Sequence, residues 1–275
     1  MIYQGNNKIK DIYYGISKIK EIYKGSELIY KSSLSEVDTF MTATGLAESY
    51  RVPLTNLVSG LINNNLWTKL IAIYPFCGST YSSLKYNLKD PRDMDSAYRL
   101  SSGGVGTVAY SLNAITANGN LNTFVSSSVV DMNSLSLSIL SETNNTNTGR
   151  DFTATTDLAT NRLIVSLNYT GGLFYADLFN ANTERVSTTS INSSLGFYTI
   201  SRTASNSLKA YRNGSLIGTN VNTRTNTFSG NIYIGGINTG SLTYRKYTFA
   251  CIGSGLTEAE AGTLYNLINT FKNTL

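Results

Sequence analysis

The groups in this sequence that could do chemistry are carboxylates, because its 275 residues include no histidine. Without histidine neither a Ser-His-Asp triad nor a Cys-His dyad can form, and zinc sites built on histidine are excluded. The two cysteines, Cys77 and Cys251, are too few for a zinc site made of four thiolates. Both lie in apolar surroundings, which indicates buried free thiols, and a disulfide between them is the alternative.

Three aspartates form the densest group of carboxylates: Asp90, Asp93 and Asp95. Calcium takes several oxygen ligands, so this set is a candidate calcium site. The glycine and the spacing of a dedicated calcium loop are missing, and Arg92 or Arg99 could pair with the aspartates instead. We therefore favour a proline-anchored, ion-paired turn and expect no cofactor.

Two tyrosine-containing loops have the chemistry of a sugar-binding site, because they place planar rings beside amide or cationic donors. The candidate ligand-binding residues are Asn168, Tyr169, Tyr244, Arg245 and Tyr247. Trp67, the single tryptophan, could also stack on a sugar. It lies between Leu66 and Leu70, however, and we predict that it packs between a helix and the main domain.

No catalytic motif accompanies these candidates. The segment Gly103-Gly104-Val105-Gly106 lacks the Gly-Lys-Ser/Thr ending of a P-loop and is interpreted as a loop between strands. Glycoside hydrolysis needs only two carboxylates, so it stays open on composition alone. Of the four glutamates after residue 70, two belong to a predicted C-terminal helix, which leaves Glu142 and Glu184. We therefore expect a protein that is not an enzyme.

The elements that must position these residues are mostly strands. Charged residues make up 14% of the sequence, where an average soluble domain has about 25%. Serine, threonine, asparagine and glycine replace them, and these residues favour turns and half-exposed strands. The sequence has 22 Lys and Arg against 17 Asp and Glu, and only its first 31 residues are clearly Lys-rich. Their lysines alternate with Ile and Tyr as on the faces of strands, so nucleic acid is not an expected partner. No stretch has the roughly 18 uninterrupted apolar residues of a membrane span, and no secretory signal is recognised, so membrane insertion and general secretion are not expected.

Residues 1–33 contain a repeat with a period of ten, in which Ile-Tyr-x-Gly recurs. The glycines suit tight turns, and we predict a small β-meander with strands from Lys8 to Tyr13 and from Lys18 to Tyr23. Strands this short are marginal on their own, so the segment should attach to a partner or oligomerise, and a folded edge of the main domain is the alternative. The predicted attachment residues are Ile2, Tyr3, Ile12, Tyr13, Ile22, Tyr23 and Tyr30.

Residues 34–70 form a predicted helical lead-in. Ser35 is expected to cap a first helix that Gly45 ends, and a second helix is expected to start near Pro53 and continue to Ile62. At the other end of the chain, Thr257 and Glu260 form the capping box of a C-terminal helix.

Residues 71–275 are expected to form one domain of many short strands. Asn213-Gly214 and Gly171-Gly172 are hairpin turns between apolar runs. Regular strands without intervening helices predict an all-β sandwich or jelly roll. The expected strands are Ile71–Phe76, Ser134–Ser141, Arg162–Tyr169, Gly196–Ser201, Ser207–Arg212, Asn231–Gly235 and Thr248–Ile252.

The segment from Leu208 to Gly218 resembles the tyrosine strand, Asn-Gly turn and return strand of concanavalin A-like lectin/glucanase (laminin G-like) domains. The residues from Ile232 to Gly236 resemble the next strand of those domains, and the residues from Phe249 to Glu260 look like their closing strand and terminal helix. The resemblance implies a jelly-roll β-sandwich. Related glucanases place their carboxylates at alternate positions of one strand, and no such Glu-x-Asp-x-x-Glu pattern occurs here.

A narrower resemblance is to tailed-bacteriophage virion proteins that join a helical lead-in to a laminin G-like domain. It rests on the segments from Leu66 to Phe76, from Lys85 to Asp93 and from Gly196 to Asn206, together with the N-terminal decads. It implies a fibre, decoration or tail-associated structural protein on the virion surface, made in the bacterial cytoplasm.

The expected partners are other virion proteins and further copies of the chain, with a trimer as the favoured oligomer. A host-surface glycan is an expected ligand of the displayed domain. A carbohydrate-binding adhesin outside a virion is the alternative function, and a glycosidase is less favoured.

Overall fold

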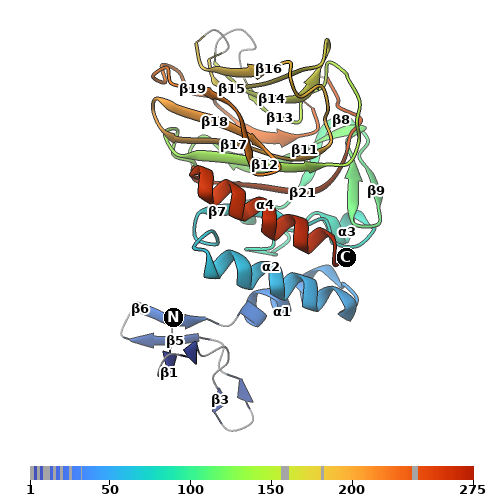
Figure 1. Ribbon diagram of the computed structural model, residues 1–275. Helices are drawn as coiled ribbons and strands as arrows, with labels where there is room; N and C mark the ends of the chain where they lie inside the picture. Colours follow the sequence, from blue (N-terminus) through green and yellow to red (C-terminus); the bar gives the residue numbers. More distant parts are fainter. Residues whose placement is uncertain are drawn as a thin grey trace.

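Two antiparallel sheets lie face to face in the computed structural model, and a layer of helices covers the outer face of one of them (Figure 1). The structure describes residues 3–4, 7–8, 13–14, 17–18, 21–24, 27–31, 33–155, 161–180, 183–236 and 241–275. This arrangement is the predicted jelly-roll β-sandwich.

The first sheet has eight strands in the order β19-β18-β17-β12-β21-β10-β9, with β7 also paired to β21. Its strands are β7 (Leu70–Tyr74), β9 (Ala109–Ser111), β10 (Ala114–Thr116), β12 (Leu135–Ser141), β17 (Gly196–Ala204), β18 (Ser207–Arg212), β19 (Ser215–Asn220) and β21 (Lys246–Gly253). The second sheet has seven strands in the order β16-β15-β14-β13-β20-β11-β8. Its strands are β8 (Ser101–Gly106), β11 (Gly119–Ser126), β13 (Phe152–Thr155), β14 (Arg162–Tyr169), β15 (Leu173–Phe179), β16 (Arg185–Thr188) and β20 (Asn231–Ile234).

The sandwich core lies between the sheets because alternate strand residues point to one face. Leu137 and Ile139 of β12 and Leu163 and Val165 of β14 belong to this core, and all four side chains are fully buried. The residues that alternate with Leu137 and Ile139 on β12 point to the opposite face of the sheet. Strand alternation thus supplies the inner face of both sheets.

The helix layer has its own apolar core against the outer face of the eight-stranded sheet. The helices are α1 (Ser33–Thr44), α2 (Arg51–Asn63), α3 (Tyr81–Leu84) and α4 (Glu258–Lys272), with short 3-10 turns η1 (Glu48–Tyr50) and η2 (Asp95–Ala97). Leu57 and Leu61 of α2 and Leu264 and Ile268 of α4 are buried in this core with Cys251 of the sheet. The helical lead-in therefore packs on the sandwich domain.

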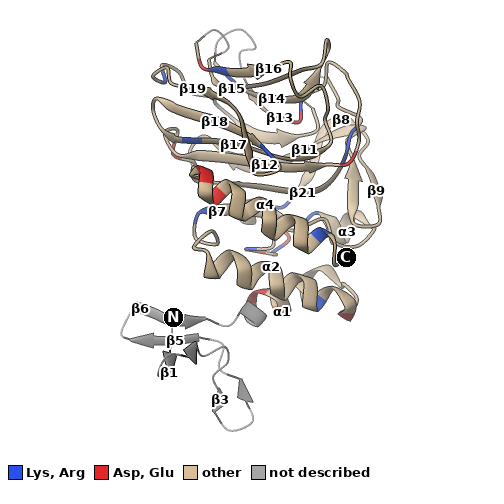
Figure 2. Cartoon of the chain, viewed as in Figure 1, with Lys and Arg blue, Asp and Glu red and all other residues tan. Residues whose placement is uncertain are grey.

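The close packing of α2 on α4 depends on Gly60. A Cβ atom at this position would lie 2.4 Å from Cδ2 of Leu267. The capping box at Thr257 and Glu260 begins α4 as the sequence predicts, and the helix has two glutamates in its first turn and Lys272 in its last (Figure 2). Negative charge at the start of the helix and positive charge at its end both interact favourably with the helix dipole.

Both predicted hairpin turns are confirmed. Asn213 and Gly214 have φ angles of 50° and 77° between β18 and β19, and Gly171 and Gly172 have φ angles of 83° and 78° between β14 and β15. All seven expected strands are present, with ends that differ by up to three residues. Cys77 and Cys251 are buried free thiols, as the sequence indicates.

Three expectations about local structure are wrong. The segment from Gly103 to Gly106 is not a loop but part of the edge strand β8, where a Cβ atom at Gly103 would lie 2.5 Å from Oδ1 of Asn120. The first helix starts at Ser33 rather than after Ser35, and the second starts at Arg51, so that Pro53 falls inside its first turn. Proline is tolerated there because the first N–H groups of a helix have no partner within it.

The described residues of the N-terminal repeat form three separate two-stranded antiparallel hairpins. They pair β1 (Tyr3–Gln4) with β2 (Asn7–Lys8), β3 (Tyr13–Tyr14) with β4 (Ser17–Lys18), and β5 (Glu21–Lys24) with β6 (Glu27–Lys31). The middle parts of the two expected six-residue strands lie outside the described residues. None of the helices in the described part of the chain has the length and apolarity needed to cross a bilayer.

Candidate functional site

A buried ion pair joins the two tyrosine-containing loops at one end of the sandwich. The side chains of Arg245 and Asp151 are both fully buried, and Nη1 of Arg245 lies 2.6 Å from Oδ2 of Asp151. Nη2 of the same arginine donates to the carbonyl of Asn145 at 3.1 Å and to that of Asn168 at 2.9 Å. One guanidinium therefore connects segments that are far apart in the sequence.

Asp151 is held by two further donors. The hydroxyl of Tyr247 donates to its Oδ1 at 2.5 Å, and the backbone N–H of Leu167 donates to its Oδ2 at 2.9 Å. Burial raises the pKa of Tyr247 well above its usual value, and the neighbouring carboxylate of Asp151 adds to the effect, so the hydroxyl keeps its proton. Burial disfavours the charged form of Arg245, but Asp151 outweighs it and the pKa of the guanidinium is raised. The guanidinium of Arg245 therefore keeps its positive charge at any ordinary pH.

The polar run from Asn144 to Thr148 lies between the two loops. The side-chain amides of Asn145 and Asn147 both donate to the carbonyl of Thr243, the former at 3.1 Å. The backbone N–H of Asn147 donates to the carbonyl of Asn168 at 3.3 Å. We call residues 143–149, 168–172, 193–195 and 241–245 the loop cluster.

The loop cluster presents Tyr244 to solvent. Its side chain is 58% exposed, whereas Thr243 and Arg245 on either side are fully buried. Its φ angle is 54°, and its N–H donates to the carbonyl of Ala117 at 3.1 Å. A bulky residue rarely takes this left-handed conformation, and it persists only where the surroundings enforce it. The backbone here therefore fixes the position of an exposed ring.

Tyr169 is the second ring of the loop cluster and is half-buried. It makes an edge contact with Tyr175, with ring centres 5.4 Å apart, and the guanidinium of Arg185 lies 4.6 Å from the centre of the Tyr175 ring. The amide nitrogen of Asn168 donates to the hydroxyl of Thr146 at 3.1 Å, while its buried Oδ1 has no hydrogen-bond partner within the described part of the chain.

The structure thus brings all five candidate ligand-binding residues to one place, but in two layers. Tyr244 and Tyr169 reach the surface, and Asn168, Arg245 and Tyr247 lie beneath it. Asn168, Arg245 and Tyr247 can therefore hold the surface residues in position without touching a ligand. The polar run between the loops was not recognised from the sequence, although the six consecutive Asn and Thr residues 143–148 were a signal for it.

The three aspartates of the candidate calcium site are paired with basic side chains. Asp90 pairs with Arg92 at 2.5 Å, and Arg99 pairs with both Asp93 and Asp95, at 2.7 and 2.9 Å. The hydrogen bond from Arg92 lowers the pKa of Asp90. Within the described ranges no group of three or more histidine, cysteine, aspartate or glutamate residues has a geometry that could hold a metal. The ion pairs are those that the turn interpretation expects.

Of the predicted attachment residues, Ile2 and Ile12 lie outside the described residues. The other five lie on the hairpin strands, and they are Tyr3, Tyr13, Ile22, Tyr23 and Tyr30. Trp67 is partly buried against the helix-side core, and Nζ of Lys89 lies 5.2 Å from the centre of its ring. The prediction that Trp67 packs between helix and sandwich is confirmed.

No family model and no curated protein matches the chain. Among solved structures, domain 4 of AbnA, a GH43 extracellular arabinanase from Geobacillus stearothermophilus in complex with arabinotriose, is similar at 15% identity and a TM-score of 0.47. That match covers 71% of this chain and 98% of the domain.

Two botulinum neurotoxin structures are similar as well. One is of type C, whose cell entry depends on interaction with two ganglioside molecules, at 16% identity and a TM-score of 0.44 over 63% of this chain and 48% of that one. The other is the serotype D ligand-binding domain in complex with N-acetylneuraminic acid, at 15% identity and a TM-score of 0.45 over 75% of this chain and 52% of that one. The chain spans about half the length of these two structures. Carbohydrate-binding domains are therefore among its structural neighbours, and at this identity they assign no ligand to it.

Proposed function

We propose that the protein is a carbohydrate-binding protein without catalytic activity, and that the loop cluster is its binding site. The observation that carries the proposal is the fixed, exposed ring of Tyr244, held in a left-handed conformation between two buried residues. Residues with a strained backbone conformation are concentrated at active sites and ligand-binding positions.

The chemistry around Tyr244 suits a glycan. A planar ring stacks on the apolar face of a sugar, and amide and hydroxyl groups exchange hydrogen bonds with its hydroxyls. Exposed Asn144, Thr146 and Thr148 supply such groups on the segment that contacts Thr243. Because buried hydrogen bonds already fix this segment, little ordering entropy would be lost on binding.

The carboxylate of Asp151, which is buried beneath the loop cluster, supports a binding role rather than hydrolysis. A glycosidase needs two carboxyl groups about 5–9.5 Å apart that face the sugar. Asp151 is fully buried, and both of its oxygens accept hydrogen bonds from the protein. Release of reducing ends from a bacterial polysaccharide by the purified chain is the outcome that would favour the glycosidase alternative.

We test the site with a glycan array probed by the full chain, by Tyr244→Ala and by Tyr81→Ala. Tyr81 has a ring that is 37% exposed on α3, so its variant is a control for loss of a surface ring elsewhere. The proposal expects binding by the wild type and the control and a loss of about 5- to 150-fold for Tyr244→Ala, which corresponds to about 1–3 kcal/mol for a stacked ring. Equal binding by all three proteins would show that the loop cluster is not the glycan-binding site.

The biological setting we propose is the surface of a tailed-phage particle, where residues 1–33 attach the chain and the sandwich is displayed. The support is the resemblance of the sequence segments to virion proteins and the three hairpins, since two-stranded hairpins are marginal in isolation and gain from a partner. A fibre, decoration or tail-associated trimer fits this setting, and an adhesin outside a virion is the alternative.

Attachment is tested by deleting residues 1–32, which leaves α1 complete from Ser33. The truncated chain should remain folded and soluble but be absent from purified particles, and it should sediment as a smaller species than the full chain. Normal incorporation of the truncated chain would refute attachment through the repeats.

A further inference from the structure

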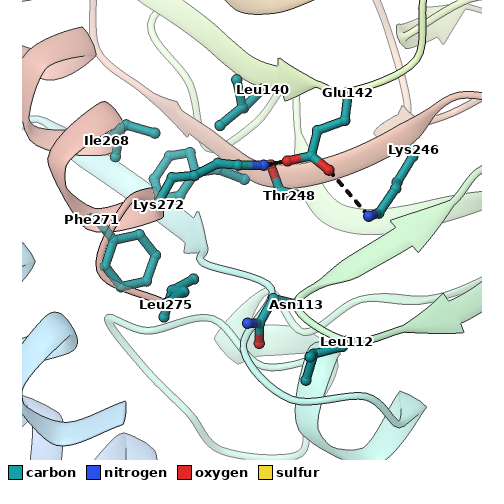
Figure 3. A pocket seen from close by; sticks show the side chains of 11 residues that line it. Leu112, Asn113, Leu140, Glu142, Lys246, Thr248, Ile268, Phe271, Lys272 and Leu275 are labelled. Carbon is teal, nitrogen blue, oxygen red and sulfur yellow. Dashed lines mark hydrogen bonds and ion pairs between the residues drawn. The ribbon is translucent and has the colours of Figure 1, made fainter. Parts of the chain in front are cut away.

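A pocket of about 190 Å³ lies where the C-terminal end of α4 leaves the outer face of the eight-stranded sheet (Figure 3). Leu140 and Phe249, which are register partners on β12 and β21, form its floor on the sheet side. Ile268 and Phe271 of α4 form the opposite apolar wall. The pocket is separate from the surface of Tyr244, which does not line it.

One side of the pocket carries charge. The carboxylate of Glu142 lies between two ammonium groups, with Nζ of Lys246 at 3.1 Å from Oε2 and Lys272 paired with Oε1 (Figure 3). Two cations therefore share one anion. Each ammonium has three N–H donors, and Lys272 also donates to the hydroxyl of Thr248 at 3.4 Å. Donors and one unit of positive charge remain for a further acceptor.

The environment of Lys272 favours that acceptor. Burial lowers the pKa of its ammonium group, because the charged form has lost part of its hydration. An anion placed beside it would restore the lost stabilisation, whereas a cationic ligand would be repelled by two ammonium groups that only one carboxylate offsets.

We propose that this pocket binds a small organic monoanion with one aromatic ring or a short alkyl chain, whose carboxylate contacts Lys272 and Lys246. The size fits, because an apolar cavity of about 150 Å³ holds benzene, and the pocket has room for a ring and a carboxylate. The ring lies between Phe249 and Phe271, and the carboxylate adds to the Glu142 ion pairs.

The experiment is an NMR titration of the full chain with phenylacetate, with hexanoate and with 2-phenylethylamine, which matches phenylacetate in shape but is a cation. Phenylacetate and hexanoate should give saturable shifts at Thr248, Ile268 and Lys272. The amine should bind at least about tenfold more weakly, since an ionic hydrogen bond is replaced by repulsion. No saturable shift with either anion up to about 10 mM, or equal binding of the amine, would overturn the proposal.

Three variants test the role of the charged side chains separately. Lys272→Met keeps the apolar stem and should weaken phenylacetate binding by about 10- to 100-fold. Glu142→Gln removes the competing carboxylate and should tighten it. Lys209→Met breaks an exposed pair with Glu258 outside the pocket and should change nothing. Unchanged affinity in Lys272→Met, with a native spectrum, would also overturn the proposal. Because none of these readouts involves a glycan, failure here is distinguishable from failure of the loop cluster.

Discussion

Replacement of Arg245 by methionine should loosen the end of the sandwich that holds the loop cluster. The change keeps an apolar side chain of similar length and removes the guanidinium that contacts Asp151 and the carbonyls of Asn145 and Asn168. Asp151 would remain fully buried, with hydrogen bonds from Tyr247 and Leu167 but without a counter-charge.

The expected cost follows from that uncompensated charge. Removing one partner of a buried ion pair destabilises a protein by about 3–5 kcal/mol. For a domain of this size each kcal/mol lowers Tm by about 2–4 °C, so the expected decrease is about 6–20 °C. The variant should still fold, because domains have about 5–15 kcal/mol of stability, and its carbohydrate binding should weaken together with the loops.

Thermal and urea unfolding of three variants measure this effect. Arg99→Met breaks the exposed pairs with Asp93 and Asp95 and should cost less than about 1 kcal/mol. The double variant Arg245→Met/Asp151→Asn removes the buried charge as well and should be more stable than Arg245→Met alone. A loss below about 1 kcal/mol for Arg245→Met, or a double variant with additive losses, would refute the reasoning.

Three further predictions follow from buried or strained positions. Burial raises the pKa of Cys251 to about 12 and that of Cys77 further, so neither thiol should react with a disulfide reagent at pH 8 until the protein unfolds, as absorbance of the released thiolate would show. Tyr244→Gly should change the unfolding free energy in urea by no more than about 1 kcal/mol, because relief of the left-handed strain offsets the entropy of glycine, yet it should abolish glycan binding. Gly214→Ala, at a φ angle of 77°, should lose about 1–2 kcal/mol in the same urea experiment.

Most of the fold could be predicted from local signals. The turn at Asn213-Gly214 and the strand Arg162–Tyr169 were predicted from the residues of those segments themselves, and both are confirmed. The strand through Gly103 was missed because glycine has no side chain that could show a polar and apolar alternation, and its place in the sheet comes from its pairing with β11. Helix starts were misplaced for a similar reason, since Arg51 opens α2 without a side-chain cap.

The candidate site was predicted only in part. Tyr169 and Tyr244 were recognised by residue type, and nothing in the sequence states that they share one end of the sandwich. Their proximity depends on the ion pair between Arg245 and Asp151, which are 94 positions apart. Nothing in the sequence around either residue indicates that the two form a pair. The pocket beside Lys272 was not predicted, because it arises only where α4 ends over the sheet.

The most direct test of the central claim is an amide hydrogen-exchange footprint of the full chain with its strongest array ligand. The account predicts added protection in residues 143–148, 168–171 and 241–245, with the outer face of α1 and α2 unchanged. Protection confined to any other surface, with no change around Tyr244, would contradict it.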